Sequence, residues 1–272
     1  MRQFEGKVAF ITGAGRGQGR SHAVRLASEG ADLVLLDMGS AGRVEHPPYR
    51  CATSADLAET VRLCEEHDVR VRSYEVDVRD YAGMEAAADD AAAQLGGIDF
   101  VIANAGITDG FYPTWEIPLE NWQTMIDVNL TGVFHTVKAT VPHVRERGPG
   151  GSIVLVSSNV ATHKAVGYLS HYVAAKIGVR GLAMALAKEL GPDGIRCNSL
   201  HPAAIQTEMT QHMVDFSDKT MEELLQQFRD SQLLAVNLEP RDATAAVVWL
   251  LSNEARYVTG LEFNVDAGDS RK

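Results

Sequence analysis

A glycine-rich turn between two apolar runs constrains the fold of this 272-residue chain more than any other feature of its sequence. Residues 7–11 predict a buried strand, residues 13–19 the turn, and residues 21–29 a helix. A second apolar strand is predicted at residues 31–36. Strand, helix and strand in this order form a βαβ unit, which has a right-handed crossover and parallel strands. The chain is therefore predicted to build a parallel sheet.

The same alternation continues towards the C-terminal end of the sequence. Five further strands are predicted, at residues 71–76, 98–103, 152–156, 195–200 and 261–265. The predicted fold class is α/β: one Rossmann-like, doubly wound sheet of seven parallel strands with helices on both faces. No internal repeat or flexible linker divides the sequence, so residues 1–272 are expected to form a single domain.

Two long segments do not fit the strand and helix pattern. Residues 38–54 follow the second strand and exceed the roughly 2 to 6 residues usual for such a connection. Residues 203–240 follow the sixth strand and predict a lid with short helices near residues 217–228. Long ordered segments beside a ligand site are often functional. We therefore expect both the insertion, residues 38–54, and the lid, residues 203–240, to border the site.

The composition limits the range of partners. A formal net charge of −11 argues against a nucleic-acid or anionic-membrane partner, because such surfaces repel an acidic protein. The N-terminal residues contain no apolar signal region and the apolar runs are too short to span a bilayer, so we expect a cytoplasmic protein. Cys51, Cys64 and Cys197 have no metal-ligand spacing, so reduced thiols and no metal site are expected.

The glycine-rich turn, Thr12-Gly-Ala-Gly-Arg-Gly-Gln-Gly19, predicts a dinucleotide site. Gly13, Gly17 and Gly19 allow a sharp turn and a close approach of the backbone to a pyrophosphate at the helix N-terminus. Asp37 ends the second strand, where its carboxylate can accept hydrogen bonds from the ribose hydroxyls and repel a 2′-phosphate. The predicted cofactor is therefore NAD. Arg16 supports two alternatives, a salt bridge to a 2′-phosphate or a solvated loop cation.

Two further strand ends are predicted to meet the cofactor. Asp77 and Val78 end the third strand, where a carboxylate can reach the adenine amino group. Asn104, Ala105 and Gly106 end the fourth strand, where small residues allow close approach. In open α/β sheets the ligand crevice lies outside the carboxyl ends of the strands, so these positions are expected to converge there.

Tyr172 and Lys176 are four residues apart in a stretch of good helix formers, which places both side chains on one helix face. An ammonium group close to a phenol stabilises the phenolate and is expected to lower the tyrosine pKa from about 10 towards the working pH. Tyr172 would then act as an acid or base. The preceding strand ends in Ser157-Ser158, and Asn129 lies in Asp127-Val-Asn129.

With these residues in place, the sequence resembles the short-chain dehydrogenase/reductase family over nearly its whole length. The matching segments are Thr12–Gly19, Asn104-Ala-Gly106, Asn129, Ser158, Tyr172-Val-Ala-Ala-Lys176, Arg196–Ser199 and Val258-Thr-Gly260. The resemblance implies that Asn129, Ser158, Tyr172 and Lys176 form a catalytic tetrad. It also implies that cofactor contacts are made by Tyr172, Lys176, Gln18, Arg16, Pro202, Ile205 and Thr207.

The spacing of the catalytic serine and tyrosine departs from the family pattern. Ser158 lies 14 positions before Tyr172, one more than the family's interval of about 13. An extra residue is therefore expected in the loop formed by residues 159–169. Ser157 remains the less favoured alternative to Ser158.

The chain resembles in particular the carveol-dehydrogenase-like, mycofactocin-associated branch of the family. The segments that carry this resemblance are Gly17–His22, the insertion, His171–Lys176, Asn198–Pro202 and Glu254–Gly260. The branch implies alicyclic and terpenoid secondary alcohols as substrates, a tightly bound NAD, and mycofactocin or another redox partner as the electron acceptor. It also implies a homotetramer in which residues 168–190, rich in Ala, Gly and Val, pack against a symmetry mate.

The predicted activity is NAD-dependent oxidation of a hydrophobic secondary alcohol to a ketone. Two alternatives stay open: a freely exchanging NADH-dependent ketoreductase that uses the same residues, and a non-catalytic NAD-binding regulator. An apolar substrate pocket has six candidate lining residues, for which core or lid packing is an equal explanation. They are Phe111, Tyr112, Trp115, Met209, Met213 and Phe228.

Overall fold

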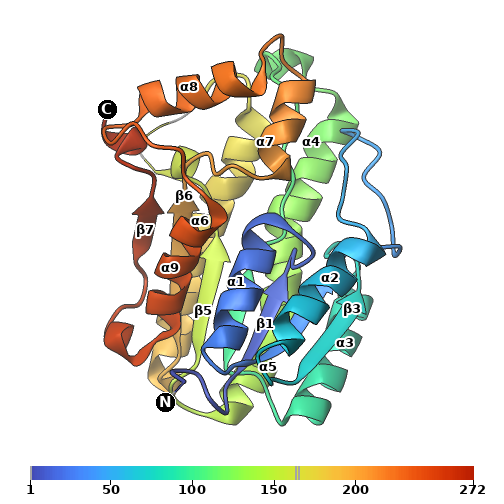
Figure 1. Ribbon diagram of the computed structural model, residues 1–272, viewed down its shortest axis with the longest axis vertical. Helices are drawn as coiled ribbons and strands as arrows, with labels where there is room; N and C mark the ends of the chain where they lie inside the picture. The colour runs from blue at the N-terminus through green and yellow to red at the C-terminus, as the bar shows by residue number, and fades with distance from the viewer. Residues whose placement is uncertain (1, 163, 165) are drawn as a thin grey trace.

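Seven strands form one parallel sheet in a computed structural model that describes residues 2–162, 164 and 166–272. The strands are β1 (Val8–Thr12), β2 (Asp32–Asp37), β3 (Val71–Glu75), β4 (Phe100–Ala103), β5 (Ser152–Val156), β6 (Arg196–Pro202) and β7 (Glu262–Val265). Their order in the sheet is β3-β2-β1-β4-β5-β6-β7, and every neighbouring pair is parallel. The predicted doubly wound α/β fold is therefore confirmed (Figure 1).

Helices cover both faces of the sheet. They are α1 (Gly17–Ser28), α2 (Ser54–Glu65), α3 (Tyr81–Leu95), α4 (Leu119–Ile126), α5 (Gly132–Arg147), α6 (Ser170–Leu190), α7 (Glu208–Asp215), α8 (Met221–Ser231) and α9 (Pro240–Leu251). One apolar core joins α1, α2 and α9 to the sheet, and a second core joins α3, α4, α5 and α6 to its other face. Because β1 and β5 are covered on both sides, all of their residues are buried.

The strand order places a crevice beside the end of β1. The chain leaves β1 towards β2 on one side, and β4 lies on the other side of β1. In such sheets the ligand crevice lies at the carboxyl ends of the strands where the order reverses. The end of β1 pairs with the end of β2 through Thr12 and Leu36. The glycine-rich turn, from which α1 begins at Gly17, therefore lies at the crevice.

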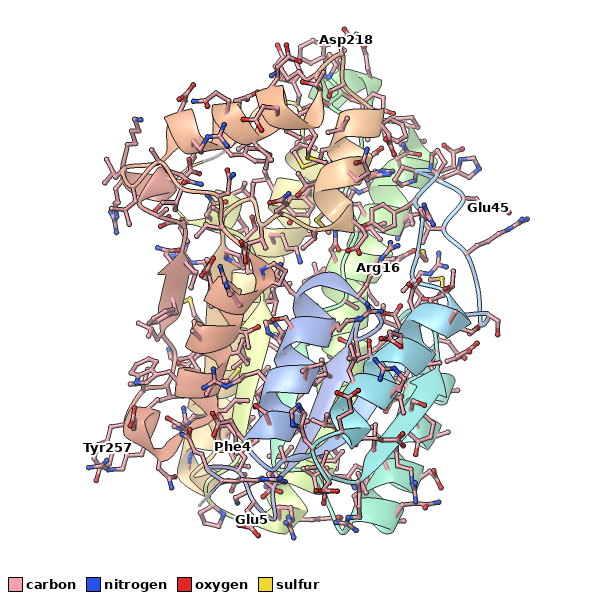
Figure 2. The ribbon with its side chains drawn as sticks, viewed as in Figure 1. Phe4, Glu5, Arg16, Glu45, Asp218 and Tyr257 are labelled. Carbon is pink, nitrogen blue, oxygen red and sulfur yellow. The ribbon has the colours of Figure 1, made fainter. Side chains whose placement is uncertain are left out.

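The insertion and the lid extend from this same edge. The insertion turns back on itself through an antiparallel bridge between Val44 and Tyr49. Its outermost part projects from the side of the molecule at Glu45, while Arg16 of the glycine-rich turn lies nearer the centre (Figure 2). The lid contains α7 and α8, and a bridge between Ile205 and Leu238 closes its base. None of the helices in the described part of the chain has the length and apolar character needed to cross a membrane.

Candidate active site

Close packing holds the glycine-rich turn in place. A Cβ atom at Gly19 would lie 2.0 Å from the Gly13 carbonyl oxygen, and one at Gly13 would lie 2.8 Å from the Ala105 Cα. Gly13 also has φ 67°, a conformation that glycine adopts without strain. The Asn104 side chain donates to the carbonyl groups of Thr12 and Gly13 at 3.0 and 3.2 Å. Hydrogen bonds therefore connect the end of β4 to the turn. Glycine is required at positions 13 and 19, where no Cβ atom fits.

A cleft runs along the glycine-rich turn and the ends of β2 and β4. Ten of the residues predicted to meet the cofactor line it: Gly13, Arg16, Gly17, Gln18, Asp37, Val78, Asn104, Ala105, Gly106 and Thr207. Gly19 is buried beneath the turn. Pro202 and Ile205 line a separate, neighbouring cavity, whereas Thr207 and Gln18 line both spaces. The sequence prediction therefore identified most of one continuous cleft.

The Asp37 carboxylate is oriented by the backbone around it. Its Oδ2 accepts from the Gly15 amide at 2.7 Å, and its Oδ1 accepts from the Met38 amide at 2.8 Å. Burial raises the pKa of Asp37 above its ordinary value, while these two hydrogen bonds and the nearby Arg16 act in the opposite direction. The Arg16 guanidinium donates to the Arg50 carbonyl of the insertion. Arg16 is thus engaged by the protein rather than simply solvated.

Asp77 lies between two residues that line the cleft, Val76 and Val78. Asp77 is not among the residues described as lining the cleft. Its Oδ2 instead accepts from Arg79 Nη2 at 2.5 Å, and its Oδ1 accepts from the Arg79 amide at 2.9 Å. Arg79 therefore orients the Asp77 carboxylate, and its contact with adenine stays a prediction.

The insertion forms part of the cleft wall. The sequence predicted that the insertion borders the site but did not predict which of its residues line the cleft. Met38, Tyr49, Cys51 and Ala52 line the cleft from this side. The lid residues Thr207, Glu208 and Met209 also line the cleft. The sequence gives no pattern that singles out Tyr49 or Cys51, because their place depends on how an irregular segment folds back.

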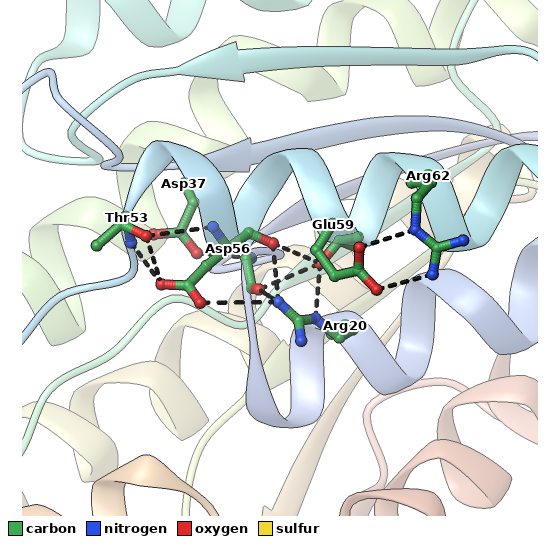
Figure 3. A network of polar contacts seen from close by, with 8 residues as sticks. Arg20, Asp37, Thr53, Asp56, Glu59 and Arg62 are labelled. Atoms are coloured by element: carbon green, nitrogen blue, oxygen red, sulfur yellow. Dashed lines mark hydrogen bonds and ion pairs between the residues drawn. The ribbon is translucent and has the colours of Figure 1, made fainter.

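A network of polar contacts anchors the end of the insertion to the glycine-rich turn. Arg20 of α1 donates to the Gly15 carbonyl at 2.5 Å and to the Asp56 carbonyl at 2.8 Å. Thr53, the last residue before α2, accepts from the Asp56 amide at 3.2 Å, and the Asp56 carboxylate accepts from the Thr53 amide. Figure 3 shows Arg20 reaching from α1 to α2 beside Thr53 and Asp56. These contacts therefore connect the turn, α1 and α2.

Tyr172 and Lys176 lie on one face of α6, as predicted, and both are largely removed from solvent. The Lys176 Nζ is 5.7 Å from the centre of the Tyr172 ring and donates to the Val156 carbonyl at 3.1 Å. Burial lowers the pKa of Lys176 to about 8. Burial also raises the pKa of Tyr172, which a hydrogen-bonding interaction with Ser158 partly opposes. The predicted lowering of the Tyr172 pKa is wrong for the chain alone, because desolvation of the phenolate outweighs the stabilising contacts.

The two serines at the end of β5 have different surroundings. The Ser157 hydroxyl donates to the Lys176 carbonyl at 2.8 Å, which joins β5 to α6. The Ser158 hydroxyl is the one that interacts with Tyr172. These contacts favour Ser158 over Ser157 as the serine of the site. The extra residue expected in the loop of residues 159–169 is not assigned to a position, because His163 and Ala165 lie outside the described residues.

Asn129 is fully buried within a π-helical turn, Asp127–Thr131, between α4 and α5. Its Oδ1 accepts from the Ile107 amide and its Nδ2 donates to the Ile107 carbonyl, each at 2.9 Å. A Cβ atom at Gly106 would lie 2.9 Å from Asn129 Oδ1 and 3.4 Å from Lys176 Nζ. The amide group of Asn129 is thus used to hold the segment after β4, which gives it a positioning role next to Lys176.

A second cavity of about 520 Å³ opens beside Ser158 and Tyr172, beneath the lid. Four of the six candidate pocket residues line it: Phe111, Met209, Met213 and Phe228. Trp115 and Tyr112 are not among its described lining residues, and Trp115 is 84% exposed. Asn159, Lys164 and Asp269 also line this cavity and were not anticipated from the sequence. The site therefore combines a cleft along the glycine-rich turn with an adjoining, mainly apolar chamber that contains a Ser–Tyr pair.

Comparisons with known proteins agree with this geometry. A family model described as enoyl-(acyl carrier protein) reductase matches residues 13–270. The (−)-trans-carveol dehydrogenase of Rhodococcus erythropolis is 42% identical over the full length of both chains. The crystal structure of carveol dehydrogenase from Mycobacterium avium in complex with NAD is 44% identical, covers 100% of both chains and superposes with a TM-score of 0.93.

A second solved structure, a short chain dehydrogenase from Mycobacterium paratuberculosis bound to NAD, is 41% identical and has a TM-score of 0.91. It covers 99% of this chain and 100% of its own. Full-length sequence identity above 40%, the same fold and the Ser–Tyr–Lys arrangement all lead to one assignment. The chain belongs to the short-chain dehydrogenase/reductase family of oxidoreductases.

Proposed function

We propose that this enzyme oxidises a hydrophobic terpenoid or alicyclic secondary alcohol to a ketone with a tightly bound NAD. The observation that carries this proposal is the mainly apolar cavity of about 520 Å³, which meets Ser158 and Tyr172 at the edge of the cofactor cleft. A cavity of this size and character suits a compact cyclic alcohol. The cofactor is NAD, as the Asp37 carboxylate in the cleft and the NAD complexes of two similar proteins support.

The residues around the cavity divide the chemistry between them. Bound NAD supplies the acceptor for the hydride that leaves the carbinol carbon. The Tyr172 phenolate accepts the hydroxyl proton, and the Ser158 hydroxyl hydrogen-bonds the substrate oxygen as its charge changes. Lys176, whose Nζ lies 5.7 Å from the centre of the Tyr172 ring, would stabilise the phenolate while it is protonated and would hold the nicotinamide ribose. Electrons then pass to a separate redox partner, of which mycofactocin is the one that the resemblance implies.

A turnover screen tests the proposal. Purified protein is offered carveol and other cyclic terpenols, steroid alcohols and short linear alcohols, with an artificial electron acceptor or with added NAD. The proposal predicts the highest kcat/KM for cyclic secondary alcohols, because they bury more apolar surface in the mainly apolar cavity than short linear alcohols do. Turnover restricted to short linear alcohols would refute the substrate class. Steady reduction of cyclic ketones by exchanging NADH would favour the ketoreductase alternative.

Replacing Asp37 with Ala is expected to weaken NAD retention about tenfold or more and to relax rejection of NADP. The reason is the loss of charge-assisted hydrogen bonds, each contributing about 1.5–3 kcal/mol, together with the loss of a charge that repels a 2′-phosphate. The measurement is the ratio of NAD to NADP that stripped protein reloads. Asp32→Ala is the matched control, because Asp32 lies at the opposite end of the same strand, β2, and pairs with Arg70. An unchanged ratio in Asp37→Ala would remove Asp37 from the specificity role.

We expect a homotetramer in solution. Apolar side chains are exposed along α6 at Ile177 and Met184 and on the neighbouring α5 at Phe134, which gives a surface suited to a symmetry mate. Light scattering should give four times the 29.5 kDa mass of one chain. Ile177→Asp, which places a charge in this surface, should give a smaller species. A monomer mass for the unmodified protein would contradict the expectation.

A further inference from the structure

We propose that Asp269, in the C-terminal segment, is a positioning residue that acts through Asn159 on the catalytic Ser158; the inference rests on the proposed alcohol oxidation. Asp269 begins a short 3₁₀ turn, Asp269–Arg271, and its side chain is 8% exposed. Its Oδ2 accepts from Asn159 Nδ2 at 2.5 Å. Asp269, Asn159 and Ser158 all line the substrate cavity.

The chemistry of Asp269 fixes which way the Asn159 amide faces. A carboxylate only accepts hydrogen bonds, and Asp269 Oδ1 pairs with Lys164 Nζ at 2.5 Å. The amide NH₂ of Asn159 must therefore face Asp269, which leaves its carbonyl oxygen facing the other way. That oxygen lies 3.4 Å from Ser158 Oγ, where it accepts the serine hydroxyl. The carboxylate thus sets which atom of Asn159 contacts Ser158 Oγ before the hydroxyl turns to the substrate oxygen.

Further hydrogen bonds fix the backbone of residues 158–162 next to Asn159. Ser158 Oγ also accepts from the Val160 amide at 3.4 Å, and the Thr162 hydroxyl donates to the Asn159 carbonyl at 2.7 Å. The His201 ring bonds the Ser158 carbonyl at 2.9 Å. Asn159 is buried, its side chain is bound by Asp269 and its carbonyl by Thr162. Asp269 therefore holds the short turn that begins at Ser158. The C-terminal segment is in this way a part of the active site.

Steady-state kinetics with carveol as the probe alcohol test the inference. Asp269→Ala is expected to lower kcat between about 10- and 100-fold with a smaller change in KM, because misplacement of a reacting group by about 1 Å has effects of this size. Asp269→Asn, which keeps an acceptor for Asn159, should restore part of kcat. Lys272→Ala is the matched control in the same segment, because Lys272 Nζ bonds the Asp230 and Gln232 carbonyls instead. Its kcat should stay at the wild-type level.

A double-mutant cycle separates positioning from general damage. If Asp269 acts through Ser158, Asp269→Ala should lower kcat no further in a Ser158→Ala background, since coupled residues are not additive. A full, additive loss in that background would overturn the inference, as would wild-type kcat in Asp269→Ala. NAD content and thermal midpoint are measured for every variant to confirm the fold.

Hydrogen–deuterium exchange answers the question without any substrate, so failure of the proposed function and failure of this inference are distinguishable. Asp269→Ala should speed exchange in the peptide spanning residues 157–162, whose Val160 amide bonds Ser158 Oγ, while Lys272→Ala should not. Unchanged exchange in Asp269→Ala would overturn the positioning role even if the enzyme turns over carveol. Faster exchange would support that role even if no tested alcohol is oxidised.

Discussion

Replacing Tyr172 with Phe is expected to lower turnover at least about 100-fold while leaving bound NAD nearly unchanged. The substitution removes one oxygen atom, and positioned proton transfer contributes about 100- to 10,000-fold to rate. The ring of Tyr172 packs against the core that α6 shares with the sheet, and Phe preserves that packing. The measurements are kcat with carveol and the amount of nicotinamide cofactor released on denaturation.

The pH dependence of the wild-type enzyme provides an internal check on this role. Alcohol oxidation requires the deprotonated phenol, and burial raises the pKa of Tyr172, so the wild-type rate should rise as pH becomes alkaline. The residual rate of Tyr172→Phe should lose this dependence. A variant that keeps more than about a tenth of the wild-type rate would show that Tyr172 is not the acid or base.

The fold was predictable because its signals are local and repeated. The buried strands read as continuous apolar runs, and each is followed by helix formers, so the alternation alone predicted the order of elements. The glycine-rich turn and the shared helix face of Tyr172 and Lys176 could likewise be predicted from a few neighbouring residues. Helix α1 was predicted to begin at residue 21 but begins at Gly17, because the glycine turn itself is the first turn of the helix.

The parts that could not be predicted depend on contacts between distant segments. Asp269 lies 110 positions from Asn159, and no local pattern indicates that the two side chains meet. Asp77 was placed at a strand end from the sequence, but its ion pair with Arg79 was not anticipated. The direction of the Tyr172 pKa was also missed, because desolvation depends on how completely the side chain is covered.

Extensively dialysed protein is expected to retain close to one NAD per chain. The insertion and the lid both line the cofactor cleft, and a cluster of three tilted aromatic rings, Tyr49, His212 and Phe216, joins them. The Tyr49 and His212 rings are 4.6 Å apart, and the His212 and Phe216 rings are 4.7 Å apart. Release of the cofactor on this side therefore requires the insertion to separate from the lid, which lowers the dissociation rate more than the association rate.

Tyr49→Ala removes the ring contact between the insertion and His212 of the lid, and so tests whether this contact retains the cofactor. An aromatic pair contributes about 0.5–1.5 kcal/mol beyond its buried area, so NAD should dissociate about two- to tenfold faster from the variant. Glu45→Ala is the matched control, because Glu45 lies at the exposed outer edge of the insertion and pairs only with Arg43 among the described residues (Figure 2). NAD released from denatured protein is measured after timed dialysis. Turnover should then depend on the artificial acceptor and not on added NAD. Wild-type protein that is empty after dialysis, yet turns over steadily on added NAD, would contradict bound-cofactor catalysis and favour the freely exchanging ketoreductase.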